Sequence, residues 1–225
     1  MAHRKKGYRF ENDWPLENMR KATEETYVKV VTIPVNVEIE GDHRVLNYDR
    51  VKQLLINANK IILQNCICRE QRGNCDAPLH VCIGLDERAE YLLGLESGRA
   101  QEVGIEEALS ALKKSHEAGL VHLTFTRRDN KRLDGVDLIC GCCSCCCIVL
   151  SGILRYGLAP HLLTSDTTEV TDYDKCTLCG VCVNRCQFGA REIVDDSLVV
   201  NHDLCFGCGL CVSTCPTNAI TLIKK

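Results

Sequence analysis

Eight cysteines near the C-terminus have a spacing that suits iron–sulfur chemistry. They form two copies of the pattern C-x2-C-x2-C-x3-C, and the second copy follows the first at one constant offset. The copies are Cys176, Cys179, Cys182 and Cys186, and then Cys205, Cys208, Cys211 and Cys215. A [4Fe–4S] cubane takes four thiolate ligands, so the duplicated pattern predicts two such clusters.

The pattern also predicts how the eight ligands are shared. Three closely spaced cysteines can surround one cluster, whereas the fourth begins a segment that leads away and serves the other cluster. Cluster 1 is therefore assigned to Cys176, Cys179, Cys182 and Cys215. Cluster 2 is assigned to Cys205, Cys208, Cys211 and Cys186. Two zinc sites are the alternative, but zinc motifs usually pair two short knuckles across a spacer.

Ten further cysteines lie upstream, in a less regular arrangement. They are Cys66, Cys68, Cys75 and Cys82, followed by the dense run Cys140, Cys142, Cys143, Cys145, Cys146 and Cys147. Neighbouring cysteines on one backbone point in divergent directions, so the dense run cannot bind a single iron with all its thiols. We expect these ten residues to hold at least one further iron–sulfur cluster, with the remaining thiols packed as small apolar groups. A structural zinc ion or a set of buried, redox-buffering thiols is the alternative.

Residues 171–225 resemble a bacterial-type ferredoxin with two [4Fe–4S] clusters. One position departs from that family, because Gln187 stands where the second copy has Pro216 and the family often has proline in both halves. The departure concerns the local turn rather than the ligands.

The whole chain also resembles a group of longer 4Fe-4S binding proteins of anaerobes. The shared features are the element Cys66-x-Cys68-Arg69, the stretch Glu117–His122 and the dense cysteine run upstream of a ferredoxin module. This resemblance implies no particular reaction.

Three other residues lie close to the cysteines in sequence. Arg69 could donate hydrogen bonds to cluster sulfides or bind an anion, with a surface salt bridge as the alternative. His80 and His122 could be ligands, although a hydrogen-bonded structural histidine is the commoner case. The sequence has no G-x-G-x-x-G, G-x4-G-K-[ST] or G-x-S-x-G motif, so dinucleotide, P-loop and hydrolase chemistry lack support.

The composition of the chain indicates the cellular compartment of the protein and the state of its cysteines. The chain has 18 cysteines among 225 residues, and its 27 Lys+Arg nearly balance 30 Asp+Glu. This balance argues against a strongly basic nucleic-acid binder, and no apolar run reaches the roughly 18 residues of a membrane helix. The polar first residues lack the apolar core of a signal peptide. We therefore expect a cytoplasmic protein whose reduced thiols bind metal, without membrane insertion and without a nucleic-acid partner.

The segments between the cysteines predict short strands and longer helices. Strands are expected over 28–40, with Pro34 at a sheet edge, and over 121–126. Helices are expected over 47–62, 86–96, 105–118 and 148–156, the first of them leading into Cys66. Because strands and helices do not alternate as they do in βαβ units, the expected class is α+β. Residues 1–165 would form a larger mixed, cysteine-rich domain. Residues 166–225 would form a ferredoxin-like dicluster domain with a two-fold ββ/α pseudo-repeat. A polar linker at 161–174 would join the two domains.

Two cubanes in one small module suit one-electron transfer. The expected function is therefore to pass low-potential electrons to or from a partner oxidoreductase or flavoprotein. Two other functions stay open at this stage. The surplus of N-terminal cysteines would also suit a redox enzyme with a catalytic iron–sulfur site, and the basic N-terminus would suit an iron–sulfur sensor or regulator.

Overall fold

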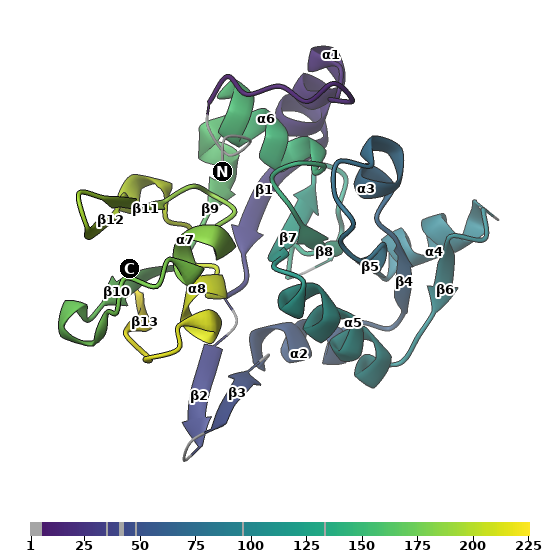
Figure 1. Ribbon diagram of the computed structural model, residues 1–225. Coiled ribbons are helices and arrows are strands. Elements are labelled where there is room, and N and C mark those ends of the chain that lie inside the picture. Colours follow the sequence, from purple (N-terminus) through teal and green to yellow (C-terminus); the bar gives the residue numbers. More distant parts are fainter. Residues whose placement is uncertain (1–5, 35, 41–42, 48, 96, 133) are drawn as a thin grey trace.

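The computed structural model describes residues 6–34, 36–40, 43–47, 49–95, 97–132 and 134–225, with only the backbone described for 36–40, 43–47 and 49. The larger part of the chain is built on a seven-stranded sheet with the strand order β6-β4-β5-β8-β7-β1-β9 (Figure 1). The strands are β1 (Tyr27–Thr32), β4 (Ile61–Asn65), β5 (His80–Leu85), β6 (Ala100–Glu102), β7 (Val121–Arg127), β8 (Leu138–Cys142) and β9 (Leu163–Thr164). Neighbouring strands are antiparallel, except that β9 runs parallel to β1.

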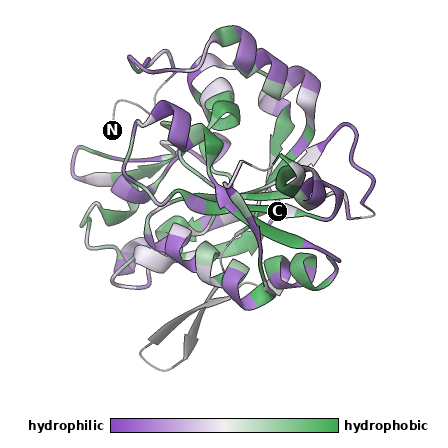
Figure 2. Ribbon diagram, turned by 90° about the vertical axis from the view of Figure 1, so that its right-hand side faces the viewer, coloured by the Kyte–Doolittle hydropathy of each residue, from purple (hydrophilic) through white to green (hydrophobic). Residues whose placement is uncertain are grey.

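Helices cover both faces of this sheet because its strands present apolar side chains on both sides. In β4, Ile61 and Leu63 face α2 (Asp49–Ile56) and α5 (Ile105–Glu117), whereas Ile62 faces the opposite side. The opposite side is covered by α1 (Leu16–Arg20), the π-helical turn η2 (Lys21–Thr26), α4 (Glu87–Gly94) and α6 (Ile148–Tyr156). The short helix α3 (Ile67–Arg72) follows β4. Figure 2 shows the central strands as mainly hydrophobic and the outer sides of the helices as hydrophilic.

The last part of the chain forms a small module beside the β9 edge of the sheet (Figure 1). Strand β10 (Thr167–Thr171) pairs with β13 (Ile220–Lys224), and β11 (Arg191–Val194) pairs with β12 (Ser197–Val200), both antiparallel. The helices α7 (Val181–Arg185) and α8 (Leu210–Thr214) contact each other. Three 3-10 turns complete the elements: η3 (Pro160–Leu162), η4 (Tyr173–Lys175) and η5 (His202–Leu204).

Several expected elements are present, and the class is α+β as predicted. Helix α6 spans Ile148–Tyr156, and α5 ends one residue before its predicted end. Gly119, just after α5, has a φ of +81°, and a Cβ there would meet Arg185 Nη1 at 3.1 Å. Glycine therefore meets both a conformational and a steric requirement at this helix end. Residue 96, the predicted end of α4, lies outside the described residues.

Three expectations are wrong. The predicted strand over 28–40 is two strands, β1 and β2 (Asn36–Glu40), and β2 forms a hairpin with β3 (His43–Asn47). Pro34 lies between them because it cannot donate a ladder hydrogen bond, and β1 is an inner strand flanked by β7 and β9 rather than an edge. The helix predicted over 47–62 ends at Ile56, since the β-branched pair Ile61 and Ile62 is buried on both faces of the sheet.

The expected linker is ordered structure. Within 161–174, β9 adds to the large sheet and β10 adds to the module. The change from one sheet to the other occurs between Thr164 and Thr167. Among the described residues, no helix combines the length and apolar character needed to cross a membrane.

Candidate iron–sulfur and metal centres

The first C-terminal group brings together thiols from both copies of the repeat. Cys176, Cys179, Cys182 and Cys215 line one cavity, which Leu198 and Ile220 also line. Three of these cysteines belong to the first copy, and Cys215 belongs to the second. This is the set that the spacing assigns to cluster 1.

The second group also combines the two copies, with one thiol from the first copy and the others from the second. Cys186, from the first copy, packs in one hydrophobic cluster with Cys205 and Cys208. Burial raises the pKa of Cys208, and the nearby charges of Cys211, Cys186 and Cys205 raise it further. These four thiols therefore lie within electrostatic reach of one another, in the set assigned to cluster 2.

The two halves build the same local structure around the fourth cysteine of each run. The backbone N–H of Ala190 donates to Cys186 Sγ at 3.3 Å, and that of Ala219 donates to Cys215 Sγ at 3.3 Å. These matching bonds hold the two sulfurs in the same way in both halves. Thiolates are the form that binds iron, so the donor chemistry of both groups fits the clusters.

A buried arginine stands between the two groups. Arg191 donates from Nη1 to Cys182 Sγ at 3.6 Å and from Nη2 to both Glu169 and Thr171 Oγ1. Burial would lower the pKa of Arg191, but the charges of Cys211 and then Glu169 and Cys182 raise it overall. The guanidinium thus supplies positive charge beside the thiolates, a role that no sequence motif indicated.

The module is docked on the large sheet by polar contacts around the end of α5. Arg185 donates to the backbone oxygens of His116 and Glu117 at the C-terminal end of α5. His116 Nε2 lies 2.7 Å from Ser213 Oγ. Farther along, Thr32 Oγ1 donates to the backbone oxygen of Phe206 at 2.6 Å.

The contacts of Gln187 explain why glutamine, rather than the proline of the ferredoxin pattern, stands at this position. Its Oε1 accepts from the backbone N–H of Ser144 at 3.1 Å and from Ser144 Oγ at 3.0 Å. Its Nε2 donates to the backbone oxygen of Gly119 at 2.9 Å. A proline here could make none of these side-chain bonds. Gln187 therefore ties the residue after Cys186 to the dense N-terminal cysteine run.

We expect Gln187→Leu to weaken this docking. The change leaves the buried Ser144 N–H and hydroxyl without their acceptor, at a cost of about 1–3 kcal/mol. The measurement is anaerobic urea unfolding of the full chain, followed by the visible absorbance of the clusters. Gln53→Leu makes the same change on the exposed side of α2 and is the control. Equal unfolding midpoints for the two variants would contradict the bridging role.

The ten N-terminal thiols, considered together in the sequence, form two neighbouring sets, and members of both sets pack in one apolar cluster. Six of them lie near enough to one another that each shifts the pKa of two others, and we call these six the sextet. Its members are Cys66, Cys68, Cys147, Cys142, Cys140 and Cys82. Cys82 and Cys140 are direct partners across β5 and β8, and Cys142 lies on the same face of β8 two residues on.

Hydrogen bonding sets the protonation pattern of the sextet. The pKa of Cys66 is lowered to about 3 because the thiols of Cys68 and Cys82 donate to it. The pKa of Cys140 is lowered to about 6 because Cys142 and Cys82 donate to it. Cys68, Cys82 and Cys142 have raised pKa values because of hydrogen bonds to neighbouring cysteines and because they are buried. Six neighbouring thiols, three of them with lowered pKa values, form a donor set that fits a thiophilic metal cluster.

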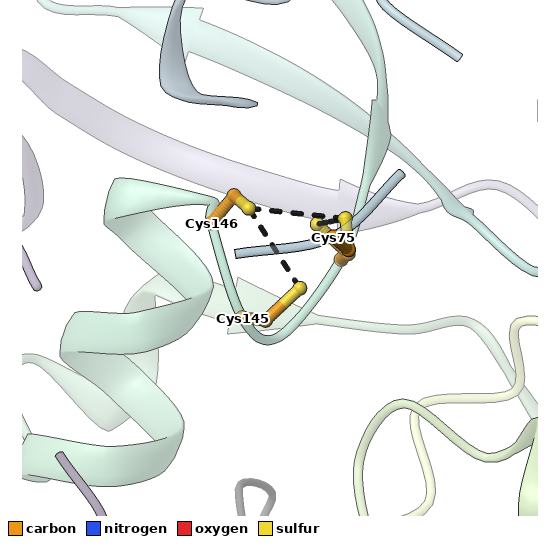
Figure 3. A group of neighbouring side chains, drawn as sticks. Cys75, Cys145 and Cys146 are labelled. Atoms are coloured by element: carbon orange, nitrogen blue, oxygen red, sulfur yellow. Dashed lines mark hydrogen bonds between the residues drawn. The ribbon is translucent and has the colours of Figure 1, made fainter. Parts of the chain in front are cut away.

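The other four thiols form a second set, which we call the quartet. Its members are Cys75, Cys143, Cys145 and Cys146. All four sulfurs lie within 4.8 Å of one another. Figure 3 shows the sulfurs of Cys75, Cys145 and Cys146 pointing into one small space at the start of α6.

The dense cysteine run is therefore shared between two sites. Cys142 and Cys147 point to the sextet, whereas Cys143, Cys145 and Cys146 point to the quartet. Their side chains diverge because successive residues of an extended or turning backbone face different sides.

The other three sequence candidates have distinct roles. Arg69 is buried, so the surface salt bridge is wrong; it donates to the backbone oxygens of Pro78 and Gly141 and to Cys143 Sγ at 3.6 Å. His122 Nε2 lies 2.9 Å from Ser115 Oγ, on the α5 side of the sheet. His80 Nδ1 lies 3.1 Å from Asn65 Oδ1. Both histidines thus fit the structural interpretation rather than ligation.

Comparison with known families agrees with the geometry of the module. The family model Fer4, a 4Fe-4S binding domain, matches residues 169–192 and 198–221, and each matched stretch contains one copy of the cysteine repeat. The chain therefore carries a ferredoxin-type 4Fe-4S module near its C-terminus, with the iron–sulfur electron-transfer capacity of that domain. Among curated proteins, no sequence match was found.

Proposed function

We propose that the chain is an electron-transfer protein that holds two [4Fe–4S] clusters in residues 166–225 and a further cluster in the sextet of residues 1–165. Each cluster, when bound, supplies one-electron storage at low potential. The observation that carries the proposal is that the sextet and the second C-terminal group share one hydrophobic core. Cys142 and Cys147 are buried in it together with Cys186, and Cys205 and Cys208 pack against it.

Apolar packing connects the three donor sets. Part of the sextet belongs to the same hydrophobic core as the second group. The first group lies in another apolar cluster, in which Cys182 and Cys215 pack with Leu198. Cys211 of the second group also packs against this cluster. Phe188 and Phe206, with ring centroids 5.0 Å apart, fill the core around the second group. Packing in shared apolar clusters would keep the sets close together, and a short separation favours electron transfer.

The first group has a side that faces solvent. Cys179 is exposed, and Leu178 and Ile193, both 41% exposed, line the same cavity. An exposed apolar rim around a redox site suits a small, transient contact with a partner protein. Residues 171–225 carry six acidic and five basic residues, so strong charge steering is not built into the module. We therefore propose a dedicated oxidoreductase or flavoprotein partner rather than a general one.

We expect about 12 irons and 12 sulfides per chain in the fully loaded protein. Eight C-terminal thiolates account for two cubanes, and the sextet has enough thiols for one more. Iron and sulfide analysis of an anaerobic, reconstituted preparation measures the number. A content that never exceeds about eight irons would remove the N-terminal cluster from the proposal.

Counting electrons tests the function itself. The loaded chain is reduced with dithionite under anaerobic conditions, freed of excess reductant and mixed with oxidised cytochrome c. We expect about three electrons per chain, one for each cluster. The triple variant Cys66→Ser, Cys82→Ser and Cys140→Ser, which leaves the sextet only three thiols, should deliver about two. The carrier role would be contradicted if the clusters took up no electrons from dithionite. It would also be contradicted if the cluster spectra responded to small substrates rather than to electron acceptors.

A further inference from the structure

The quartet has a geometry that differs from that of a cluster site. Cys75 Sγ lies 3.8 Å from Cys143 Sγ and 3.8 Å from Cys146 Sγ, and Cys145 Sγ lies 3.8 Å from Cys146 Sγ (Figure 3). A single ion with four thiolates at about 2.3 Å places tetrahedral sulfurs about 3.8 Å apart. In a cubane each thiolate binds its own iron at a separate corner, so the thiolate sulfurs stand farther apart.

The quartet is also closed. Cys143, Cys145 and Cys146 are at most 8% exposed, and Cys75 supplies the fourth sulfur from the partly exposed loop after α3. Four protein ligands leave no position for water or substrate, which is typical of structural rather than catalytic zinc sites.

Neighbouring polar groups hold the four cysteines in place. Asn74 Nδ2 donates to the backbone oxygen of Cys145 at 3.1 Å, and Trp14 Nε1 donates to that of Cys146 at 2.8 Å. The guanidinium of Arg69 contacts Cys143 Sγ and brings one positive charge to a set of thiolates. Outer contacts of this kind orient the ligands of metal sites.

The quartet joins segments that are distant in sequence. Cys75 lies in the loop between α3 and β5, whereas the other three cysteines lie between β8 and α6. Asn74 also donates to the backbone oxygen of Asn12, which brings the N-terminal segment to the same place. An ion at this point would close a long loop, and metal binding of this kind contributes to folding free energy.

We propose that Cys75, Cys143, Cys145 and Cys146 bind one tetrahedral metal ion, with zinc as its occupant, in a site separate from every iron–sulfur cluster. The site has no redox task and does not depend on the carrier function. Its role is to hold the α3–β5 loop against the start of α6.

The test is the metal content of the full chain, purified anaerobically. We expect about one zinc per chain beside the iron. Cys145→Ser should lower zinc to well below half an equivalent and leave iron and sulfide unchanged. The triple variant Cys66→Ser, Cys82→Ser and Cys140→Ser, which leaves the sextet three thiols, should lower iron by about four and leave zinc unchanged.

X-ray absorption at the zinc edge of the unaltered chain gives a second measurement that does not depend on whether a variant folds. Four sulfur neighbours at about 2.3 Å, with no metal neighbour, would support the proposal. Loss of several irons together with sulfide in Cys145→Ser would overturn it, because the quartet would then be a cluster site. So would an unaltered chain that contains no metal beyond its iron–sulfur clusters.

Discussion

Replacing Cys215 with serine should remove about four irons from the module, and those irons should come from the cluster held by the first copy of the repeat. Cys215 lines the same cavity as Cys179, although 35 intervening residues separate them in sequence. Cys208 belongs to the other group, with Cys186.

Combined variants show which cluster is lost. Because Cys179 and Cys215 would serve one cluster, Cys179→Ser with Cys215→Ser should still lose only about four irons. Cys208→Ser with Cys215→Ser should lose about eight, because it damages both clusters. Iron and sulfide analysis and EPR of the dithionite-reduced full chain give the counts. The opposite result, with the larger loss in the first pair, would show that each copy holds its own cluster.

Arg191→Leu should destabilise the module by about 3–5 kcal/mol, because it leaves the carboxylate of Glu169 buried without its partner. Both side chains are 2% exposed, and Thr171 Oγ1 also donates to Glu169 Oε2 at 2.6 Å. The free energy of unfolding is measured in anaerobic urea titrations, with the visible absorbance of the clusters as the signal.

Two further variants separate the ion pair from a general effect of losing arginine. Arg20→Leu removes the same side chain from an exposed pair with Glu24, and its cost should stay below about 1 kcal/mol. The double variant Arg191→Leu with Glu169→Leu should recover part of the loss, since no unpaired charge then stays buried. A double variant as unstable as Arg191→Leu alone would locate the effect in the Cys182 contact instead.

Local patterns in the sequence were sufficient to predict much of the fold and the C-terminal module. Helix α6 follows from its apolar residues, and the repeat of cysteines and glycines leads to matching turns in both halves, with φ values of +73° at Gly180 and +77° at Gly209. Such features depend on neighbours in sequence, so they can be predicted from it.

Elements whose environment is set by distant partners were predicted less well. Ile61 and Ile62 were assigned to a helix because their spacing continues the apolar stripe of α2. They form a strand because β5 and β6 lie on either side of them. The polar stretch around Thr167 was assigned to a linker, but it pairs with residues near the C-terminus. Pairing across such separations leaves no periodic signal at either partner.

The sequence by itself determined that the chain binds iron–sulfur clusters, because three ligands of each tight run lie within a few residues and only the fourth is brought from the other copy by the fold. Only the tertiary structure decided how the ten upstream cysteines are divided. Cys75 and Cys82 are close in sequence, yet the loop takes Cys75 to the quartet, and pairing with β8 takes Cys82 to the sextet. The side to which a thiol points depends on strand register and on the loop path, and both are set by packing against distant parts of the chain.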